Sequence, residues 1–178
     1  MAGLNHFSHS HPLELINTPQ TDPSPPITCT ACELNIIPGR PFYACRSCVY
    51  SLHHLCSSLP HTIKHPSDPD HELSLLPKPT HAESPFECKA CGKIGNGFSY
   101  RCGSCSTDHH VLCTMMPCTF KCASHAAHPL SLAFEAPYEQ HAFVCDECGK
   151  PGWNQWLYRC VGCQFDLHLG CAAMNPSA

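Results

Sequence analysis

Alternating leucine pairs open three segments of the chain and predict short β-strands there. The pairs are Leu13 and Leu15, Leu73 and Leu75, and Leu130 and Leu132. Alternation of apolar and polar residues is typical of a strand that buries one face. Two more apolar positions recur downstream, at Ile27, Phe86 and Phe143 and at Tyr43, Tyr100 and Tyr158. We therefore expect one strand at each leucine pair and another at each of the three repeated tyrosines. The repeated apolar residues should form a small core in each of three modules.

Cysteine and histidine repeat in register with this apolar pattern. A histidine precedes each leucine pair, and it is followed by two Cys-x2-Cys pairs and one His-x2-Cys pair. The sets are His11, Cys29, Cys32, Cys45, Cys48, His53 and Cys56; His71, Cys88, Cys91, Cys102, Cys105, His110 and Cys113; and His128, Cys145, Cys148, Cys160, Cys163, His168 and Cys171. A further His or Cys ends the first two modules, at His65 and Cys122. We place the modules at residues 6–65, 66–122 and 123–174.

The exchange of His65 for Cys122 at one repeat position favours metal binding over disulfides. The two residue types share little except zinc ligation, and zinc accepts thiolate and imidazole in one tetrahedral shell. The chain has 17 cysteines, an odd number, which also fits a disulfide framework poorly. Cysteines that act only as small buried apolar residues are the plain alternative, but that does not explain the paired spacing.

Composition narrows the function classes. The chain has 18 prolines, 13% charged residues and a net charge of −4. Its lysines and arginines are scattered singly, so composition does not indicate nucleic-acid binding, although it does not exclude it. No apolar run is long enough for a signal peptide or a membrane span, which predicts a cytoplasmic or nuclear location with reduced thiols.

Each module is too small to be stabilised by its apolar core alone, so we expect bound zinc to supply the difference. Secondary structure should then be sparse. We expect a short helix after His53, His110 and His168. The proline-rich segments Pro19–Pro26 and Pro66–Asp70 are interpreted as extended loops or linkers.

The spacing resembles the phorbol-ester/diacylglycerol-type zinc fingers, in the divergent cysteine/histidine-rich form abundant in plants. The His-Pro-Leu start, the Tyr-x-Cys-x2-Cys run and the Leu-His-x2-Cys run from Leu167 to Cys171 carry this resemblance over nearly the whole chain. It implies a small, zinc-stabilised, irregular α+β fold with three tandem treble-clef-like modules, each with short strands and one short helix. It also implies two zinc ions per module, hence five or six Zn²⁺ in total.

The resemblance further implies an interleaved ligand order, whereas spacing alone also allows both Cys pairs to bind one ion. One site of each module would take the first Cys pair with the His-x2-Cys pair, giving Cys29, Cys32, His53 and Cys56; Cys88, Cys91, His110 and Cys113; and Cys145, Cys148, His168 and Cys171. The other would take the opening histidine, the second Cys pair and the final ligand, giving His11, Cys45, Cys48 and His65; His71, Cys102, Cys105 and Cys122; and His128, Cys160 and Cys163.

The third module departs from the family because it lacks a final ligand. Three ligands and an open position are also the pattern of a catalytic zinc. A site completed by water or by a nearby residue such as His6, or an empty site, is the alternative that we favour. The loops between the Cys pairs, such as Gly149–Arg159, are shorter than in lipid-binding relatives and lack their Gln-Gly, which argues against diacylglycerol as a ligand.

The remaining polar and aromatic residues have simpler interpretations. Cys118 lies outside the pattern as a free thiol or an alternate ligand. Of Trp153 and Trp156, we expect one in the core and one exposed. The histidines predicted to be solvated loop residues are His6, His9, His54, His81, His125 and His141.

Function is therefore predicted to be that of a non-enzymatic binding module. Protein partners in stress or defence signalling are what the family resemblance implies. Lipid binding through apolar loop tips at Ile36/Ile37, Phe98 and Trp153 is a second hypothesis. Reduction of protein disulfides by a Cys-x2-Cys pair is a third, but the helix N-terminus that lowers the thiol pKa in such enzymes is not evident in this sequence.

Overall fold

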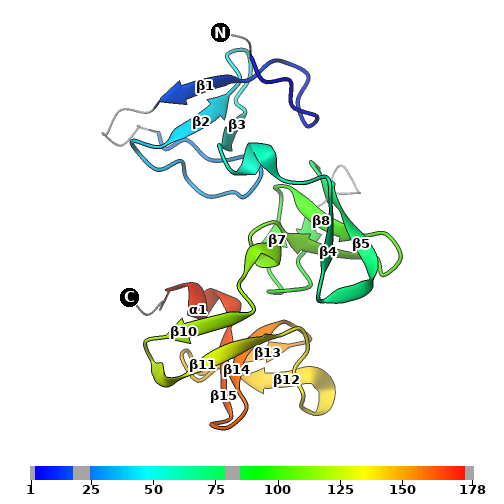
Figure 1. The fold of residues 1–178 in the computed structure, drawn as a ribbon, viewed down its shortest axis with the longest axis vertical. Coiled ribbons are helices and arrows are strands. Elements are labelled where there is room, and N and C mark those ends of the chain that lie inside the picture. The colour runs from blue at the N-terminus through cyan, green and yellow to red at the C-terminus, as the bar shows by residue number, and fades with distance from the viewer. Residues whose placement is uncertain (1–2, 18–24, 79–84, 175–178) are drawn as a thin grey trace.

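Short strands and turns dominate the computed structural model, which describes residues 3–17, 25–78 and 85–174. Most of the expected loop Pro19–Pro26 lies outside the described residues. The three modules follow one another along the long axis of the molecule (Figure 1). No helix in the described part is long and apolar enough to cross a membrane.

Each module is built on one antiparallel sheet. The first has three strands, β1 (Glu14–Asn17), β2 (Pro41–Ala44) and β3 (Ser51–His53). The second has four, in the order β4 (Thr62–His65), β5 (Asp68–Leu76), β8 (Ser99–Cys102) and β9 (Thr107–His110). The third repeats this order with β10 (Thr119–Cys122), β11 (His125–Ala133), β14 (Leu157–Cys160) and β15 (Phe165–His168). The strands expected at the leucine pairs and before the second Cys pairs are present.

The strand that ends at His65 belongs to the sheet of the second module. It pairs with β5, with Ile63 opposite Leu73 and His65 opposite Asp68. The strand that ends at Cys122 pairs in the same way with β11, in the sheet of the third module. The expected loop Pro66–Asp70 is therefore wrong in part, because β5 already begins at Asp68.

Smaller elements complete the modules. Two-stranded hairpins join β6 (Phe86–Glu87) to β7 (Ile94–Gly95) and β12 (Ala142–Val144) to β13 (Pro151–Trp153), and the isolated bridge between Thr28 and Asn35 takes their place in the first module. The expected helices are two 3₁₀ turns, η1 (Cys56–Ser58) and η2 (Cys113–Met115), and one α-helix, α1 (Leu169–Met174). A further 3₁₀ turn, η3, covers Glu139–His141.

The apolar core extends across the module boundaries. One cluster joins Leu13 and Leu52 of the first module to Leu73 and Phe98 of the second. The other joins Phe86 and Ala90 of the second module to residues of the third, including Trp156 and Leu167. Sharing a core in this way helps modules that are too small to bury enough apolar surface alone.

The same contact is made at both junctions. The backbone amide of Phe98 donates to the Ala31 carbonyl at 2.9 Å, and that of Trp156 donates to the Ala90 carbonyl at 2.9 Å. Ala31 and Ala90 each lie inside the first Cys pair of the preceding module. Both aromatic side chains are almost fully buried, at 1% and 2% exposure. At both junctions, therefore, a buried aromatic residue of one module is bonded to the turn of the first Cys pair in the module before it.

Aromatic and tyrosine contacts strengthen each junction. The Trp156 ring stacks on His65, with centroids 5.0 Å apart, and lies 4.9 Å from Phe134. The tyrosines that precede the second Cys pairs bond to the connecting segments: the Tyr100 hydroxyl donates to the Pro60 carbonyl at 2.8 Å, and Tyr158 donates to Pro117 at 2.6 Å. Trp153 is 59% exposed, so one tryptophan is in the core and one is outside it, as expected.

Candidate metal centres

Each first Cys pair lies on a tight turn that aims both sulfurs to one side. The residue after the pair has positive φ in all three modules, at Glu33, Gly92 and Gly149. Its amide donates to the carbonyl of the first cysteine, at 2.9 Å, 2.8 Å and 2.8 Å in chain order. Glycine adopts this backbone conformation at little cost, so the second and third modules place it where it is needed. Glu33 takes the same conformation without that advantage.

The first Cys pair and the His-x2-Cys pair converge in every module. We call these sets the first-pair groups; they are Cys29, Cys32, His53 and Cys56; Cys88, Cys91, His110 and Cys113; and Cys145, Cys148, His168 and Cys171. Within each group the donor atoms lie within 4.8 Å of one another. The histidine Nδ1 lies 3.3 Å from Cys32 Sγ in the first module and 3.5 Å from Cys148 Sγ in the third.

The opening histidine and the second Cys pair form the second-pair groups. In the first module His11 and Cys48 approach to 3.2 Å between Nδ1 and Sγ, and the fourth member is His9. In the third module His128 and Cys163 approach to 3.3 Å, and the fourth member is His125. The third module is therefore not one ligand short, because a histidine upstream of His128 fills the place expected to be open.

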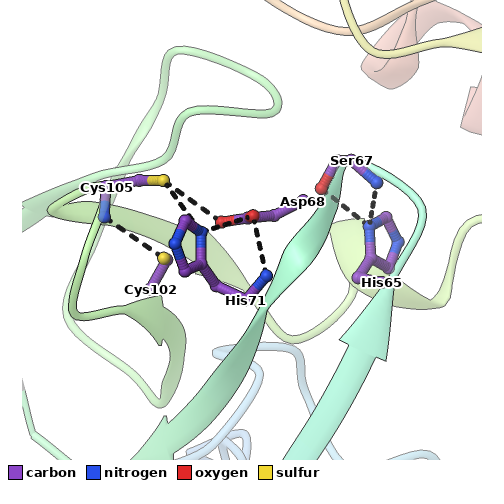
Figure 2. Close-up of polar contacts among 6 residues, drawn as sticks. All are labelled: His65, Ser67, Asp68, His71, Cys102 and Cys105. Carbon is purple, nitrogen blue, oxygen red and sulfur yellow. Dashed lines mark hydrogen bonds and ion pairs between the residues drawn. The ribbon is translucent and has the colours of Figure 1, made fainter.

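The second module has a carboxylate at the corresponding position. Asp68 Oδ1 lies 2.9 Å from His71 Nδ1, and Asp68 Oδ2 lies 3.3 Å from Cys105 Sγ. His71 Nδ1 is 3.6 Å from the same sulfur, and the Cys105 amide donates to Cys102 Sγ at 3.2 Å. Figure 2 shows these side chains meeting between β5 and the turn that follows β8.

The geometry of these groups fits tetrahedral zinc. Zn–S bonds of about 2.3 Å and Zn–N bonds of about 2.0–2.1 Å place sulfur and nitrogen roughly 3.5 Å apart at a tetrahedral angle. The Nδ1-to-Sγ distances within the groups run from 3.2 Å, between His11 and Cys48, to 4.0 Å, between His168 and Cys171. All 17 cysteines are free thiols rather than disulfides. The donor sets are thus closed four-atom groups of the kind that binds structural zinc.

Proton sharing within the groups points to the same requirement for a cation. Hydrogen bonding to Cys32, and next to Cys56, lowers the pKa of Cys29, while hydrogen bonding to Cys29 raises the pKa of Cys56. Hydrogen bonding to Cys88 raises the pKa of His110 to about 10. Hydrogen bonding to Cys102, and then to His71, lowers the pKa of Asp68 to about 2. Thiols this close cannot all ionise without a bound cation, and metal binding would release their protons.

His65 and Cys122, expected as final ligands, lie outside these groups. His65 Nδ1 pairs with the Ser67 hydroxyl at 2.8 Å, and its ring stacks on Trp156. Cys122 Sγ lies 3.0 Å from the Ser124 hydroxyl and is fully buried in the core. Both residues end a strand of the following module, so their side chains serve the junction and the core. His6 is equivalent to them, with Nδ1 2.5 Å from the Ser8 hydroxyl.

A short motif in the sequence identifies the upstream donors that spacing from the opening histidine missed. A serine directly precedes each donor, in Ser8-His9, Ser67-Asp68 and Ser124-His125, and His6, His65 and Cys122 come two residues before the serines. The repeat therefore begins earlier than the opening histidine. His9 and His125 are corrections to the expectation of solvated loop residues, and His6 is buried. His54, His141 and Cys118 are exposed, and His81 lies outside the described residues.

Comparison with known proteins agrees with this arrangement. The sequence model of the C1 domain matches residues 7–57, 66–114 and 123–172. The chain belongs to the C1 domain family. Each C1 domain match includes all members of its first-pair group and of its second-pair group. The first two matches stop before the strands that end at His65 and Cys122. No curated protein and no solved structure matches the chain.

Proposed function

We propose that the protein is a zinc-stabilised scaffold whose three C1 domains bind protein partners in signalling or stress responses, in the cytoplasm or nucleus. The proposal rests on the number of protein donors in each group. Each holds four protein donors, and a zinc site with four protein ligands has no open position for a substrate. Zinc would therefore hold the fold together, leaving the outer faces of the domains free to bind.

An apolar groove at the first junction supports binding to a protein. It has a volume of about 630 Å³ and is lined by Leu34, Ile37 and Leu55 of the first domain and by Leu112 and Met115 of the second. Ile37 is 62% exposed and Leu55 is 74% exposed. Contiguous exposed apolar surface of this kind marks interaction sites on soluble proteins.

The first test is to count zinc by native mass spectrometry on protein purified without chelator. Five or six ions support the scaffold, whereas three or fewer would contradict the four-donor groups. Partner binding is tested by site-specific photocrosslinking from position 37. Crosslinks that disappear in Leu55→Ser, but persist in the control Val49→Ser, an exposed apolar residue outside the groove, support the groove as the binding site.

Lipid binding is a second candidate, favoured by the exposed tips at Ile37 and Trp153. Phe98 and Ile36, also considered as tips, are buried. Sedimentation with liposomes of neutral and anionic lipid tests this candidate. Binding that Ile37→Ser and Trp153→Ser abolish would favour lipid over protein.

Protein-disulfide reduction has less support. The cysteines of all six pairs lie beside histidine or carboxylate donors in groups that fit zinc, and zinc would block their thiolates. An insulin-reduction assay on zinc-loaded protein tests this, and turnover would contradict the non-enzymatic proposal.

A further inference from the structure

The second-pair group of the middle domain differs from the other groups in one donor. His9 and His125 supply an imidazole in the first and third domains, whereas Asp68 supplies a carboxylate in the second. The two carboxylate oxygens contact different members of the group: Oδ1 contacts His71 and Oδ2 contacts Cys105 (Figure 2). The carboxylate therefore points into the group rather than toward solvent.

The β4–β5 hairpin fixes Asp68 in this position. Asp68 lies opposite His65 across the hairpin, and its Oδ1 also accepts a hydrogen bond from the His71 amide at 3.2 Å. The Ser67 amide donates to His65 Nδ1 at 3.2 Å, so the turn before Asp68 is held from its other side. His65 in turn stacks on Trp156 of the next domain. The carboxylate is thus preorganised before a metal binds.

Charge at Asp68 indicates that a cation is needed there. Its side chain is 12% exposed, and its ion-pair partner among the described residues is His71 rather than a lysine or arginine. A largely buried carboxylate is costly unless it is paired or bound to a metal. The two thiols beside it add negative charge when they ionise. A divalent cation bound between the three groups would offset most of this negative charge.

We propose that Asp68 is the fourth ligand of a divalent transition metal in the middle domain, and that this mixed carboxylate, imidazole and dithiolate site releases its metal first. The proposal rests on zinc binding by the C1 domains. With zinc, two thiolates and a carboxylate leave this site with a charge of −1, whereas two thiolates and two imidazoles leave a neutral site. Imidazole and thiolate suit zinc, whereas carboxylate suits harder ions.

The exposure of two of its ligands should also make this site release its metal readily. The His71 side chain is 41% exposed and Cys105 is exposed, so water and competing chelators can reach this site. By contrast, three of the four members of the first-pair group in the same domain are partly buried and Cys88 is fully buried. The sister second-pair groups are exposed too, at His11, Cys48, His128 and Cys163, so exposure separates second-pair from first-pair groups and the Asp68 carboxylate sets the middle site apart from its sisters. We therefore expect a single site that exchanges its metal fastest.

The test is zinc release from the full zinc-loaded chain to the chromophoric chelator 4-(2-pyridylazo)resorcinol, with native mass spectrometry to count ions. The wild type should release one ion in a fast phase. Asp68→His, which restores the donor of the sister sites, should keep the count and slow that phase by about tenfold or more, the scale on which changes around a metal site alter affinity. Asp68→Ala should bind one ion fewer.

Asp70→Ala is the matched control, because Asp70 lies on the same strand and is exposed. It should keep the wild-type count and rates. Asp68→Ala could also loosen the fold, so emission from the buried Trp156, measured in a Trp153→Phe background, reports whether the junction is intact. Slower release in Asp68→His cannot arise from misfolding.

The outcomes separate the two proposals. An Asp68→Ala protein with the wild-type ion count, or an Asp68→His protein with an unchanged fast phase, would overturn the role of Asp68 alone. A wild type with three or fewer ions would overturn the zinc scaffold and, with it, this site.

Discussion

The Trp156 amide donates to the Ala90 carbonyl at 2.9 Å, and Ala90 lies between Cys88 and Cys91 of the preceding domain. A residue of the third domain is therefore bonded to the turn that positions two metal donors of the second. The Trp156 ring also packs 5.2 Å from His109, next to the donor His110. Folding of one domain and metal binding by its neighbour are physically linked through this residue.

Removing the Trp156 side chain should destabilise the junction. Trp156→Ala deletes a side chain that is 2% exposed, and such large-to-small changes cost about 3–5 kcal/mol. Urea denaturation of zinc-loaded protein should show a clearly lower midpoint. Trp153→Ala, three residues earlier in the chain but 59% exposed, should change stability by no more than about 0.5 kcal/mol. Equal midpoints for the two variants would contradict the role of the junction.

The upstream donors should control the zinc count. His9→Ala and His125→Ala each remove one member of a four-donor group, so each protein should hold one ion fewer or lose one on mild chelation. The measurement is native mass spectrometry.

His65→Ala and Cys122→Ala are the controls for this prediction. Both residues are buried outside the groups, so the variants should be less stable with an unchanged zinc count. Loss of an ion from either control would restore the ligand order that the family resemblance implies.

Metal removal should unfold the chain and expose Trp156. Modules of this size bury too little surface to fold without metal, and apparent binding energies of roughly 10–16 kcal/mol are typical of structural zinc in small fingers. In a Trp153→Phe background Trp156 is the sole tryptophan. Chelation should shift its emission to the red and reduce the strand signal in circular dichroism. An unchanged spectrum after complete zinc removal would show that the fold does not need metal.

Stability should fall at alkaline pH because of two buried tyrosines. Burial raises the pKa of Tyr100 and of Tyr158 to about 12, whereas unfolded tyrosine titrates near pH 10. Between these values the unfolded chain loses phenolic protons that the folded chain keeps. Stability should therefore be full below pH 10 and fall above it, by about 1.4 kcal/mol per pH unit for each tyrosine.

The check is the urea midpoint of zinc-loaded protein between pH 9 and pH 11. A Tyr100→Phe/Tyr158→Phe protein loses the hydrogen bonds to Pro60 and Pro117, so it should be less stable at pH 9. Its midpoint should depend less steeply on pH. The same slope in both proteins would exclude the tyrosines as the cause.

Much of the fold could be predicted because its signals are local. The leucine pairs predicted strands such as the one around Leu73 and Leu75, and each Cys-x2-Cys pair predicted a turn that aims two sulfurs at one ion. The joining of the first Cys pair to the His-x2-Cys pair was implied by the family resemblance, because spacing alone also allowed both Cys pairs to bind one ion. The matches to the C1 domain cover these same segments.

The upstream donors could not be found in this way, because their identity and spacing vary. The donor is histidine in the first and third domains and aspartate in the second, and it lies two residues before His11 but three before His71 and His128. His65 and Cys122 offered a more regular spacing, and only the pairing of their strands with the next sheet shows that they face the core. The sheet that a strand joins leaves no periodic mark in the sequence.

The matching amide-to-carbonyl contacts of Phe98 and Trp156 also affect how tightly a repetitive partner could bind. Each contact ties a buried aromatic residue of one domain to the first Cys turn of the domain before it, and a shared core holds successive domains together. A partner that repeats its binding motif with the same spacing would gain a high effective concentration at the second contact. A partner with mismatched spacing would bind one domain only. The array would therefore select partners by the spacing of their motifs.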